Sequence, residues 1–200
     1  MPKVYVYTIV TDAGFAPNPY GSYLTLATCK PIIRKLAQVG DIIIAHHTKS
    51  RGGGVCYVME VTEIMSQNEY YIDPRFQCKI PTPTNPTGDN CYRPVGSGEY
   101  EQLPCQHRTC DQEKDLNGLV LISENFTYWG DKSIESTQLQ HELPEWIPRA
   151  QRGYRVNNND KKRIDYKRTL EWITELPKGK LGEPSDKPKG NCSKKNNKIE

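Results

Sequence analysis

The sequence predicts an α+β fold, a small mixed β-barrel with flanking helices and long loops, followed by a disordered C-terminal tail. Three observations lead to this prediction: strand-like alternation recurs early in the chain, helical periodicity appears twice, and the last residues are polar and rich in lysine. The segments are residues 4–10, 41–47 and 55–64 for strands, residues 31–37 and 160–176 for helices, and residues 177–200 for the tail. We expect residues 1–176 to form one domain, because a chain of that length can bury a substantial core.

The opening strand alternates valine and tyrosine, a pattern typical of β-structure. A turn follows, because Gly14 and the sequence Pro17-Asn18-Pro19 exclude helix and restrict the backbone. Pro31 suits the first turn of a helix, and Gly40 is expected to end that helix. The order strand, rigid turn, short helix and strand indicates a small pocket at the rim of the barrel.

Two further strands flank a polar loop that contains three consecutive glycines, residues 52–54. The second of these strands, residues 55–64, alternates with period two, which predicts one buried face. Glycines let the backbone approach a ligand or a neighbouring segment closely, so the loop is either functional or simply flexible. Of the adjacent residues His46 and His47, only one can face a given pocket.

A long segment at residues 81–116 lacks clear periodicity, and loops of this length are usually functional or disordered. Within it, Cys91, Cys105, His107 and Cys110 form a candidate zinc set, but their spacing lacks the paired Cys-x2-Cys pattern of structural zinc sites. Unliganded residues are the simpler interpretation, and we expect no metal and no other cofactor.

The later part of the chain contains one strand and one long helix. The strand at residues 119–123 leads into an aromatic cluster at residues 126–130, which suits core packing or stacking on a base. Residues 160–176 carry an apolar stripe at helical spacing. We expect this helix to cover an open face of the barrel.

The net positive charge of the chain comes from its tail. Residues 177–200 hold seven lysines and three acidic residues, whereas residues 1–176 hold 20 basic and 21 acidic residues. A nearly neutral domain argues against a protein that grips long duplex DNA through surface charge. A single nucleotide or a flipped base needs only a small pocket. The tail is either a solvated end or a nonspecific contact for a polyanion.

No apolar run approaches the roughly 20 residues needed to cross a bilayer, and no targeting segment is recognisable, so we expect no membrane partner. Seven cysteines without a signal peptide favour reduced thiols and a cytoplasmic location. Phosphate-loop, dinucleotide-binding, nucleophile-elbow and zinc-protease motifs are missing. Their absence does not exclude an unusual transferase or hydrolase.

Several stretches of the chain resemble the nucleotide modification associated domain 2 family. They are residues 11–19, residues 25–34, residues 40–41, residues 73–76 with Lys79, residues 88–90 with Tyr92, residues 121–123 with Phe126, Tyr128 and Gly130, and residues 152–153. The resemblance implies an association with systems that modify nucleotides in DNA, many of them in phages and bacteria, without an assigned reaction.

A looser similarity is to PUA-like folds such as the EVE and ASCH domains. It rests on Gly40-Asp41 at the start of a strand, on the glycines of residues 52–54, and on Tyr71 with Asp73. This similarity implies a PUA-like barrel with a pocket for a base, and it does not imply catalysis.

The candidate nucleotide-binding residues combine side chains that stack, that hydrogen-bond to a base edge, or that attract phosphate. They are Asp12, Phe15, Asn18, Lys30, Arg34, Asp73, Arg75, Asp89, Asn90 and Tyr128. Each has a structural alternative: turn formation for the Asp and Asn residues, a solvated helix face for Lys30 with Arg34, a local ion pair for Asp73 with Arg75, and packing for the aromatic residues.

Three functional hypotheses follow. The first is a module that binds a nucleotide or a modified base in DNA or another nucleic acid, in association with a DNA base modification system. The second is an enzyme of base modification or nucleotide hydrolysis, with Asp12, Asp41 or Asp89 as the general base. The third is a phage-type sponge or inhibitor that sequesters a nucleotide signal or a host protein.

Overall fold

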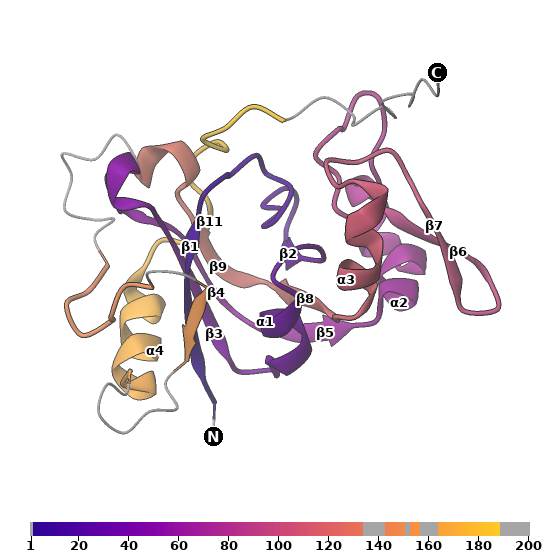
Figure 1. Ribbon diagram of the computed structural model, residues 1–200. Helices are drawn as coiled ribbons and strands as arrows, with labels where there is room; N and C mark the ends of the chain where they lie inside the picture. The colour runs from indigo at the N-terminus through magenta and orange to yellow at the C-terminus, as the bar shows by residue number, and fades with distance from the viewer. Residues whose placement is uncertain (1, 134–142, 151–152, 157–163, 189–200) are drawn as a thin grey trace, which may run out of the picture.

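The protein is an α+β structure built on one large sheet and one small sheet. Its computed structural model describes residues 2–133, 143–150, 153–156 and 164–188 (Figure 1). The large sheet has six strands in the order β10 (Tyr154–Val156), β1 (Val4–Ile9), β3 (Ile42–His47), β4 (Val55–Glu60), β9 (Asn125–Tyr128) and β11 (Gly179–Lys180). The small sheet has the order β2 (Leu24–Leu26), β8 (Val120–Ser123) and β5 (Glu63–Met65).

The predicted barrel is not confirmed, because the large sheet stays open. Its two outermost strands among the described residues, β10 and β11, pair on one side only, with β1 and with β9. β1 runs parallel to β3, and β3 runs antiparallel to β4 with a bulge between Ala45 and His46. The two sheets are joined where β8 passes into β9 at Glu124.

Apolar side chains cover both faces of the large sheet, so the expectation of a single buried face was wrong. One face packs Tyr5, Tyr7, Ile43, Tyr57 and Met59 into one core. The other packs Val4, Val6, Ile42, Ile44 and Val58 against helix α4 (Tyr166–Glu175). Burial on both sides explains why β3 reads as a continuous apolar run.

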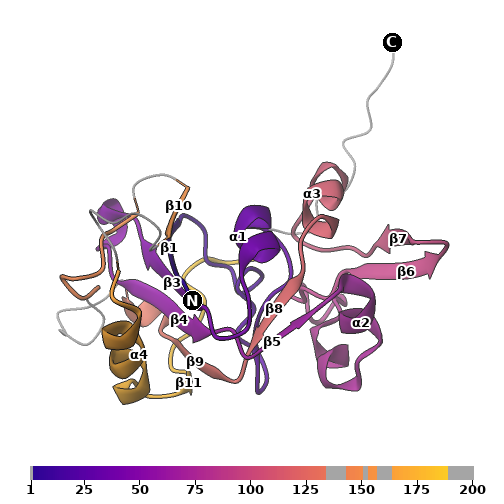
Figure 2. The same cartoon turned by 90° about the horizontal axis from the view of Figure 1, so that it is seen from below.

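Helix α4 occupies the position expected for a covering helix, on one face of the large sheet (Figures 1 and 2). It begins at Tyr166, where the Asp165 side chain accepts a hydrogen bond from the Arg168 backbone, whereas the predicted start at residue 160 lies outside the described residues. Ile173 is fully buried in the core beneath it. The predicted strand 55–64 is divided, since β4 ends at Glu60 and β5 begins at Glu63.

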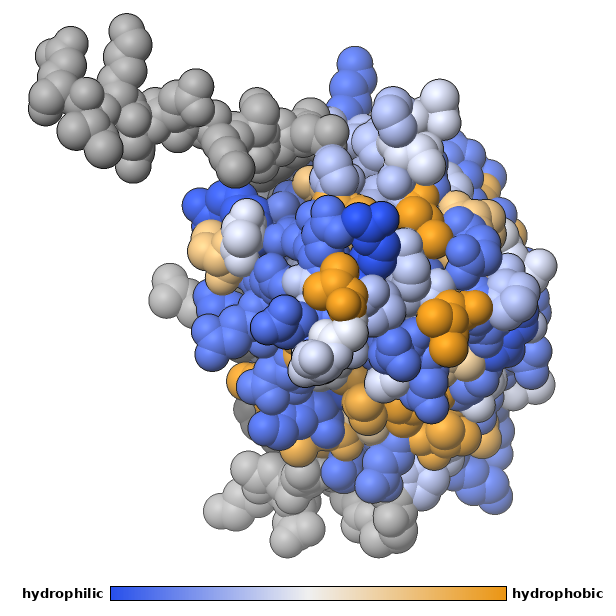
Figure 3. Space-filling model, turned by 90° about the vertical axis from the view of Figure 1, so that its right-hand side faces the viewer, coloured by the Kyte–Doolittle hydropathy of each residue, from blue (hydrophilic) through white to orange (hydrophobic). Residues whose placement is uncertain are grey.

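The remaining elements lie around the small sheet or at one end of the large sheet, where two 3-10 turns follow β3 and β9. They are α1 (Pro31–Leu36), α2 (Gln67–Ile72), α3 (Gln112–Leu116), the hairpin of β6 (Tyr92–Gly96) with β7 (Glu99–Gln102), and the 3-10 turns η1 (Lys49–Arg51), η2 (Pro74–Lys79), η3 (Thr109–Asp111) and η4 (Gly130–Ser133). The segment at residues 81–116 therefore contains a hairpin and a helix rather than only a loop. On the side of the molecule that the hairpin occupies, hydrophilic residues dominate the surface and apolar ones form small groups (Figure 3).

The disordered tail was expected to begin at residue 177, and this boundary was wrong for the described residues 177–188. β11 pairs with β9, Leu181 donates its backbone N–H to Tyr128, and Asp186 forms an ion pair with Arg51 at 2.8 Å. Main-chain hydrogen bonds hold this polar segment to the sheet without a large apolar contribution. Residues 189–200 lie outside the described part of the chain.

Candidate functional site: a cysteine, histidine and aspartate in series

Cys29 occupies a sharp turn between β2 and α1. Cys29 and Lys30 both have positive φ angles, 57° and 41°, which non-glycine residues rarely adopt. Pro31 begins α1 directly afterwards, in the place the sequence predicted. The backbone N–H of Cys29 donates to Asp115 Oδ1 at 2.8 Å, which holds the turn. A strained turn from strand to helix is a geometry that can project a nucleophile out of a fold.

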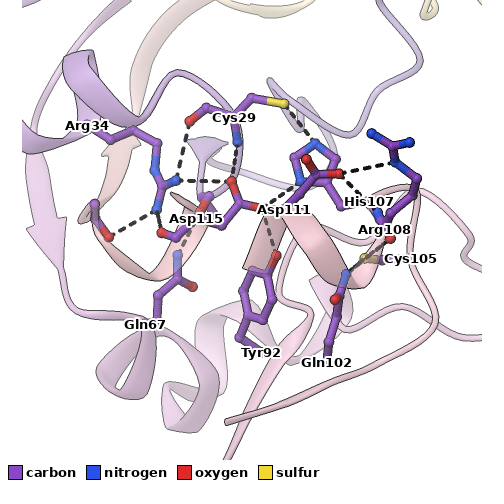
Figure 4. A network of polar contacts seen from close by, with 12 residues as sticks. Cys29, Arg34, Gln67, Tyr92, Gln102, Cys105, His107, Arg108, Asp111 and Asp115 are labelled. Atoms are coloured by element: carbon purple, nitrogen blue, oxygen red, sulfur yellow. Dashed lines mark hydrogen bonds and ion pairs between the residues drawn. The ribbon is translucent and has the colours of Figure 1, made fainter. Parts of the chain in front are cut away.

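The Cys29 thiol, the His107 imidazole and the Asp115 carboxylate stand in series (Figure 4). Cys29 Sγ lies 2.9 Å from His107 Nε2, and His107 Nδ1 lies 2.5 Å from Asp115 Oδ2. Asp115 is the most buried of the three, since its side chain is 2% exposed, whereas the His107 side chain is 17% exposed and Cys29 is half-buried. This is the arrangement of a nucleophile, a base and a group that orients the base.

Two buried side chains fix Asp115. Tyr92 donates its hydroxyl to Asp115 Oδ2 at 2.7 Å, and the Arg34 guanidinium lies 3.6 Å from Asp115 Oδ1. Arg34 also donates to the backbone carbonyls of Leu119, Asp115 and Gly118 at 2.8, 2.6 and 3.0 Å. We call Cys29, Arg34, Tyr92, His107 and Asp115 the Asp115 network. Arg34 is committed to this network, so its structure does not support the phosphate contact that the sequence suggested.

The electrostatics of the network favour a charged pair. Burial lowers the pKa of His107, but the hydrogen bonds to Asp115 and Cys29 outweigh burial and raise it to about 10. Burial raises the pKa of Asp115, and the hydrogen bond and positive charge of His107 together bring it below its usual value. His107 is therefore a cation at neutral pH, and it lies between the Asp115 carboxylate and the Cys29 sulfur.

Two sequence-predicted residues lie close to Cys29 and His107. The ring of Phe15 packs edge-on against His107, with 5.0 Å between the ring centroids. Lys30 Nζ lies 4.2 Å from the centre of the Tyr7 ring, and within the described residues no carboxylate lies within 4.0 Å of it. Burial lowers the pKa of Lys30, while the nearby Cys29 raises it. This cation is available to an anionic ligand at the thiol.

Two of the predicted residues, Asn18 and Asp89, belong to a second buried network. Asn18, Thr25, Tyr70, Lys79 and Asp89 make up the Asp89 network. Lys79 Nζ donates to Asn18 Oδ1 at 2.8 Å, and Asp89 accepts hydrogen bonds from Thr25 at 2.7 Å and from Tyr70 at 2.8 Å. Asn90 donates to the carbonyls of Tyr70 and Phe76 beside it. Apart from the buried Asn90 Oδ1, which has no hydrogen-bond partner among the described residues, these polar groups are engaged with the protein itself, so the network offers little to a base edge.

The other predicted residues lie in three separate places. Asp12 and Tyr128 meet, since the Tyr128 hydroxyl donates to the Asp12 carboxylate at 2.8 Å. Asp41, a candidate general base from the sequence, accepts backbone hydrogen bonds from Lys3 at 2.6 Å and Gln38 at 2.9 Å. Asp73 and Arg75 form an exposed ion pair at 2.7 Å, joined by Glu63.

The candidate zinc set does not assemble among the described residues. Cys110 is exposed, Cys91 and Cys105 are buried together, and His107 turns to Cys29 instead. The sequence patterns did not point to Cys29 and Asp115 as candidate site residues. The available signal was the sequence Cys29-Lys30-Pro31, a cysteine directly before a helix-starting proline, which seven cysteines obscured.

The fold and site together define an α+β protein with a half-buried cysteine thiol set beside a histidine and an aspartate. The chain belongs to the nucleotide modification associated domain 2 family, whose model matches residues 1–190. The family links the protein to nucleotide modification. No curated protein and no solved structure shows significant similarity to the chain. Among the described residues, none of the helices has the length and apolarity to cross a bilayer.

Proposed function

We propose that this protein is an enzyme of nucleotide modification, which binds a nucleotide or a modified base beside Cys29 and attacks it with the Cys29 thiolate. The observation that carries the proposal is the contact of 2.9 Å between Cys29 Sγ and His107 Nε2, completed by Asp115. A thiol that served only in packing would need neither an oriented imidazole nor a partly exposed position.

The chemistry is nucleophilic addition. The thiolate forms a carbon–sulfur bond with an electrophilic carbon of the base, or of a group that the nucleotide carries. The addition opens a bond at that carbon. The electron pair of this bond moves to the atom at its other end, and His107 donates its proton to that atom. Attack by a thiolate replaces the carboxylate general base that the sequence suggested for an enzyme.

The substrate class rests on the family and on charge. The family concerns nucleotide modification, and residues 1–176 are nearly neutral overall. Lys30 supplies a cation near the thiol that pairs with no described carboxylate, which suits the phosphate of one nucleotide rather than a long duplex. A nucleophilic thiol also requires a reducing compartment, so the proposal includes a cytoplasmic location.

The first experiment follows the protein and the substrate by mass spectrometry. The full chain is incubated with free nucleotides and with DNA oligonucleotides that carry normal and modified bases. We expect a covalent adduct on the Cys29 peptide or a changed substrate, lost in Cys29→Ser and kept in Cys110→Ser. Cys110 is the matched control, because it is exposed and lies outside the Asp115 network. Turnover in Cys29→Ser would overturn the proposal, and ligand binding without adduct or turnover would favour a binding module.

The second experiment needs no substrate. Iodoacetamide modifies thiolates, so its rate at each cysteine reports thiolate content and access. Cys29 is expected to react at least about tenfold faster than Cys110 at pH 6, where an ordinary thiol is almost fully protonated. Equal rates at pH 6 would show that His107 does not activate the thiol.

A further inference from the structure

A second group of reactive side chains lies inside the large sheet, apart from the Asp115 network. Asp12 follows β1, His47 is the last residue of β3, and Cys56 is in β4. All three are buried, with exposed fractions of 1%, 0% and 0%. The bulge in the pairing of β3 with β4 falls at this point, and bulges redirect side chains at the ends of strands. One potential ligand atom from each residue lies within 4.8 Å of the other two.

The protein around them satisfies these groups only in part: the carboxylate has hydrogen bonds but no cation, and the imidazole has no hydrogen-bond partner among the described residues. Neither ring nitrogen of His47 has a hydrogen-bond partner among the described residues, although the Gly130 backbone lies near the ring. The Asp12 carboxylate accepts hydrogen bonds from Tyr128 and from the Cys56 thiol, at 2.8 and 3.4 Å, but none of the described cations lies within 4.0 Å of it. A buried imidazole without partners and a buried carboxylate without a cation both cost free energy. A metal ion bound between them would remove both costs.

We propose that Asp12, His47 and Cys56 bind a zinc ion. Zinc takes carboxylate, imidazole and thiolate ligands at about 2.0–2.3 Å, so the ligand atoms of a tetrahedral site are roughly 3.3–3.8 Å apart. Small rotations of the three side chains would bring them to that spacing. Binding releases the Cys56 proton to solvent, and the two charges of the ion are then balanced by one thiolate and one carboxylate. The complex is neutral, as a buried site requires.

The surroundings of the three residues supply candidates for a fourth zinc ligand and a chain segment that closes the site. The Tyr128 hydroxyl and a water molecule are the candidate fourth ligands, since three protein ligands leave one position open. The C-terminal segment closes the site, because the Ser185 backbone donates to Asp12 Oδ2 at 3.3 Å and Asp186 is held by Arg51. A surface hollow of about 420 Å³, lined in part by Ala13, Ser185 and Asp186, adjoins this cover and offers a route for the ion.

Metal titration of the full chain tests the site independently of any catalytic activity. The protein is treated with a chelator and titrated with Co²⁺, whose thiolate complexes absorb strongly in the near ultraviolet. We expect a thiolate-to-cobalt band that saturates at one equivalent, disappears in Cys56→Ser, and is displaced by Zn²⁺. His47→Gln is expected to weaken binding by roughly tenfold or more.

Controls separate this site from the other thiols and from loss of folding. Cys29→Ser should keep the band, because Cys29 belongs to the Asp115 network. Circular dichroism shows whether the Cys56 and His47 variants are folded. A second control uses no variant: the thermal midpoint of the unmodified chain should rise with Zn²⁺ and fall again with a chelator. The proposal would be overturned if the unmodified chain gave neither a saturating cobalt band nor a rise in its thermal midpoint with Zn²⁺. It would also be overturned if the band persisted in Cys56→Ser.

Discussion

The Asp115 network and the Asp89 network both involve β2, and each places a buried aspartate among tyrosine and cationic partners. Thr25 of the Asp89 network lies in β2, and Cys29 of the Asp115 network follows the same strand. The five residues of the Asp89 network are fully or nearly fully buried. The Asp115 network instead ends in a half-buried thiol. Access to solvent at one end is what separates a candidate catalytic site from an internal support.

The pKa values of the two aspartates differ for the same reason. Burial raises the pKa of Asp89, and Lys79, Thr25 and Tyr70 do not fully offset it. Burial also raises the pKa of Asp115, but His107, Tyr92 and Arg34 outweigh it and lower the value. The Asp115 carboxylate is thus kept charged beside an imidazolium, as an orienting group must be.

The largest expected difference is in the rate of reaction at Cys29 when each aspartate in turn is replaced by asparagine. Asp115→Asn removes the acceptor that orients His107, so we expect the rate of covalent reaction at Cys29 to fall by about 10³–10⁴. Asp89→Asn should leave that rate within about twofold. Rates are measured on the Cys29 peptide by mass spectrometry, with folding checked by circular dichroism. Equal losses in the two variants would show that both networks act only through stability.

Replacing one cation tests the structural role of the Asp89 network. Lys79→Met removes the donor to Asn18 and to the Tyr23 carbonyl, contacts of 2.8 and 3.0 Å. We expect a loss of about 3 kcal/mol or more in the free energy of unfolding, measured in urea. Exposed Lys35→Met is the control and should change it by less than about 0.5 kcal/mol. A loss below 1 kcal/mol in Lys79→Met would mean that water replaces the ammonium.

The two networks should also respond to pH in opposite directions. The pKa of His107 is raised from 6.5 to about 10, so its contribution to stability is complete below about pH 6.5 and is lost as pH rises through 10. Burial lowers the pKa of Lys79 from 10.5 to about 8, so the folded state holds fewer protons between pH 8 and 10.5 and that residue makes stability rise there.

Variants isolate these two contributions. The difference in unfolding free energy between the unmodified chain and His107→Gln should shrink from pH 6.5 to pH 10. The corresponding difference for Lys79→Met should grow between pH 8 and pH 10.5. Both are measured by urea unfolding at a series of pH values. Parallel slopes in the two variants would contradict the assigned protonation states.

The sequence predicts more of the fold than of the site. Alternation and helical spacing located β1, β3, β4, β8 and α4, because these patterns record local burial. The open sheet depended on how β10 and β11 pair, and such short edge strands carry little pattern of their own. The site depends on contacts across long separations, since Cys29 meets residues 78 and 86 positions away. Asp89 and Asn18 were predicted as binding residues from their residue type, but their side chains make hydrogen bonds to buried groups of the protein itself.

The smallest expected effect concerns Arg75, which the sequence suggested for phosphate binding. Arg75 is 38% exposed and lies between Asp73 and Glu63, at 2.7 and 2.9 Å. Because solvent screens exposed ion pairs, Arg75→Ala should change the free energy of unfolding by about 0–1 kcal/mol, with less effect in 1 M salt. Its guanidinium is already engaged by two carboxylates, so nucleotide binding should not change. Lys30→Ala is the comparison, because Lys30 adjoins Cys29 and lacks a described carboxylate partner. Weaker binding in Arg75→Ala with unchanged binding in Lys30→Ala would move the phosphate contact to the exposed side of the small sheet, away from the thiol.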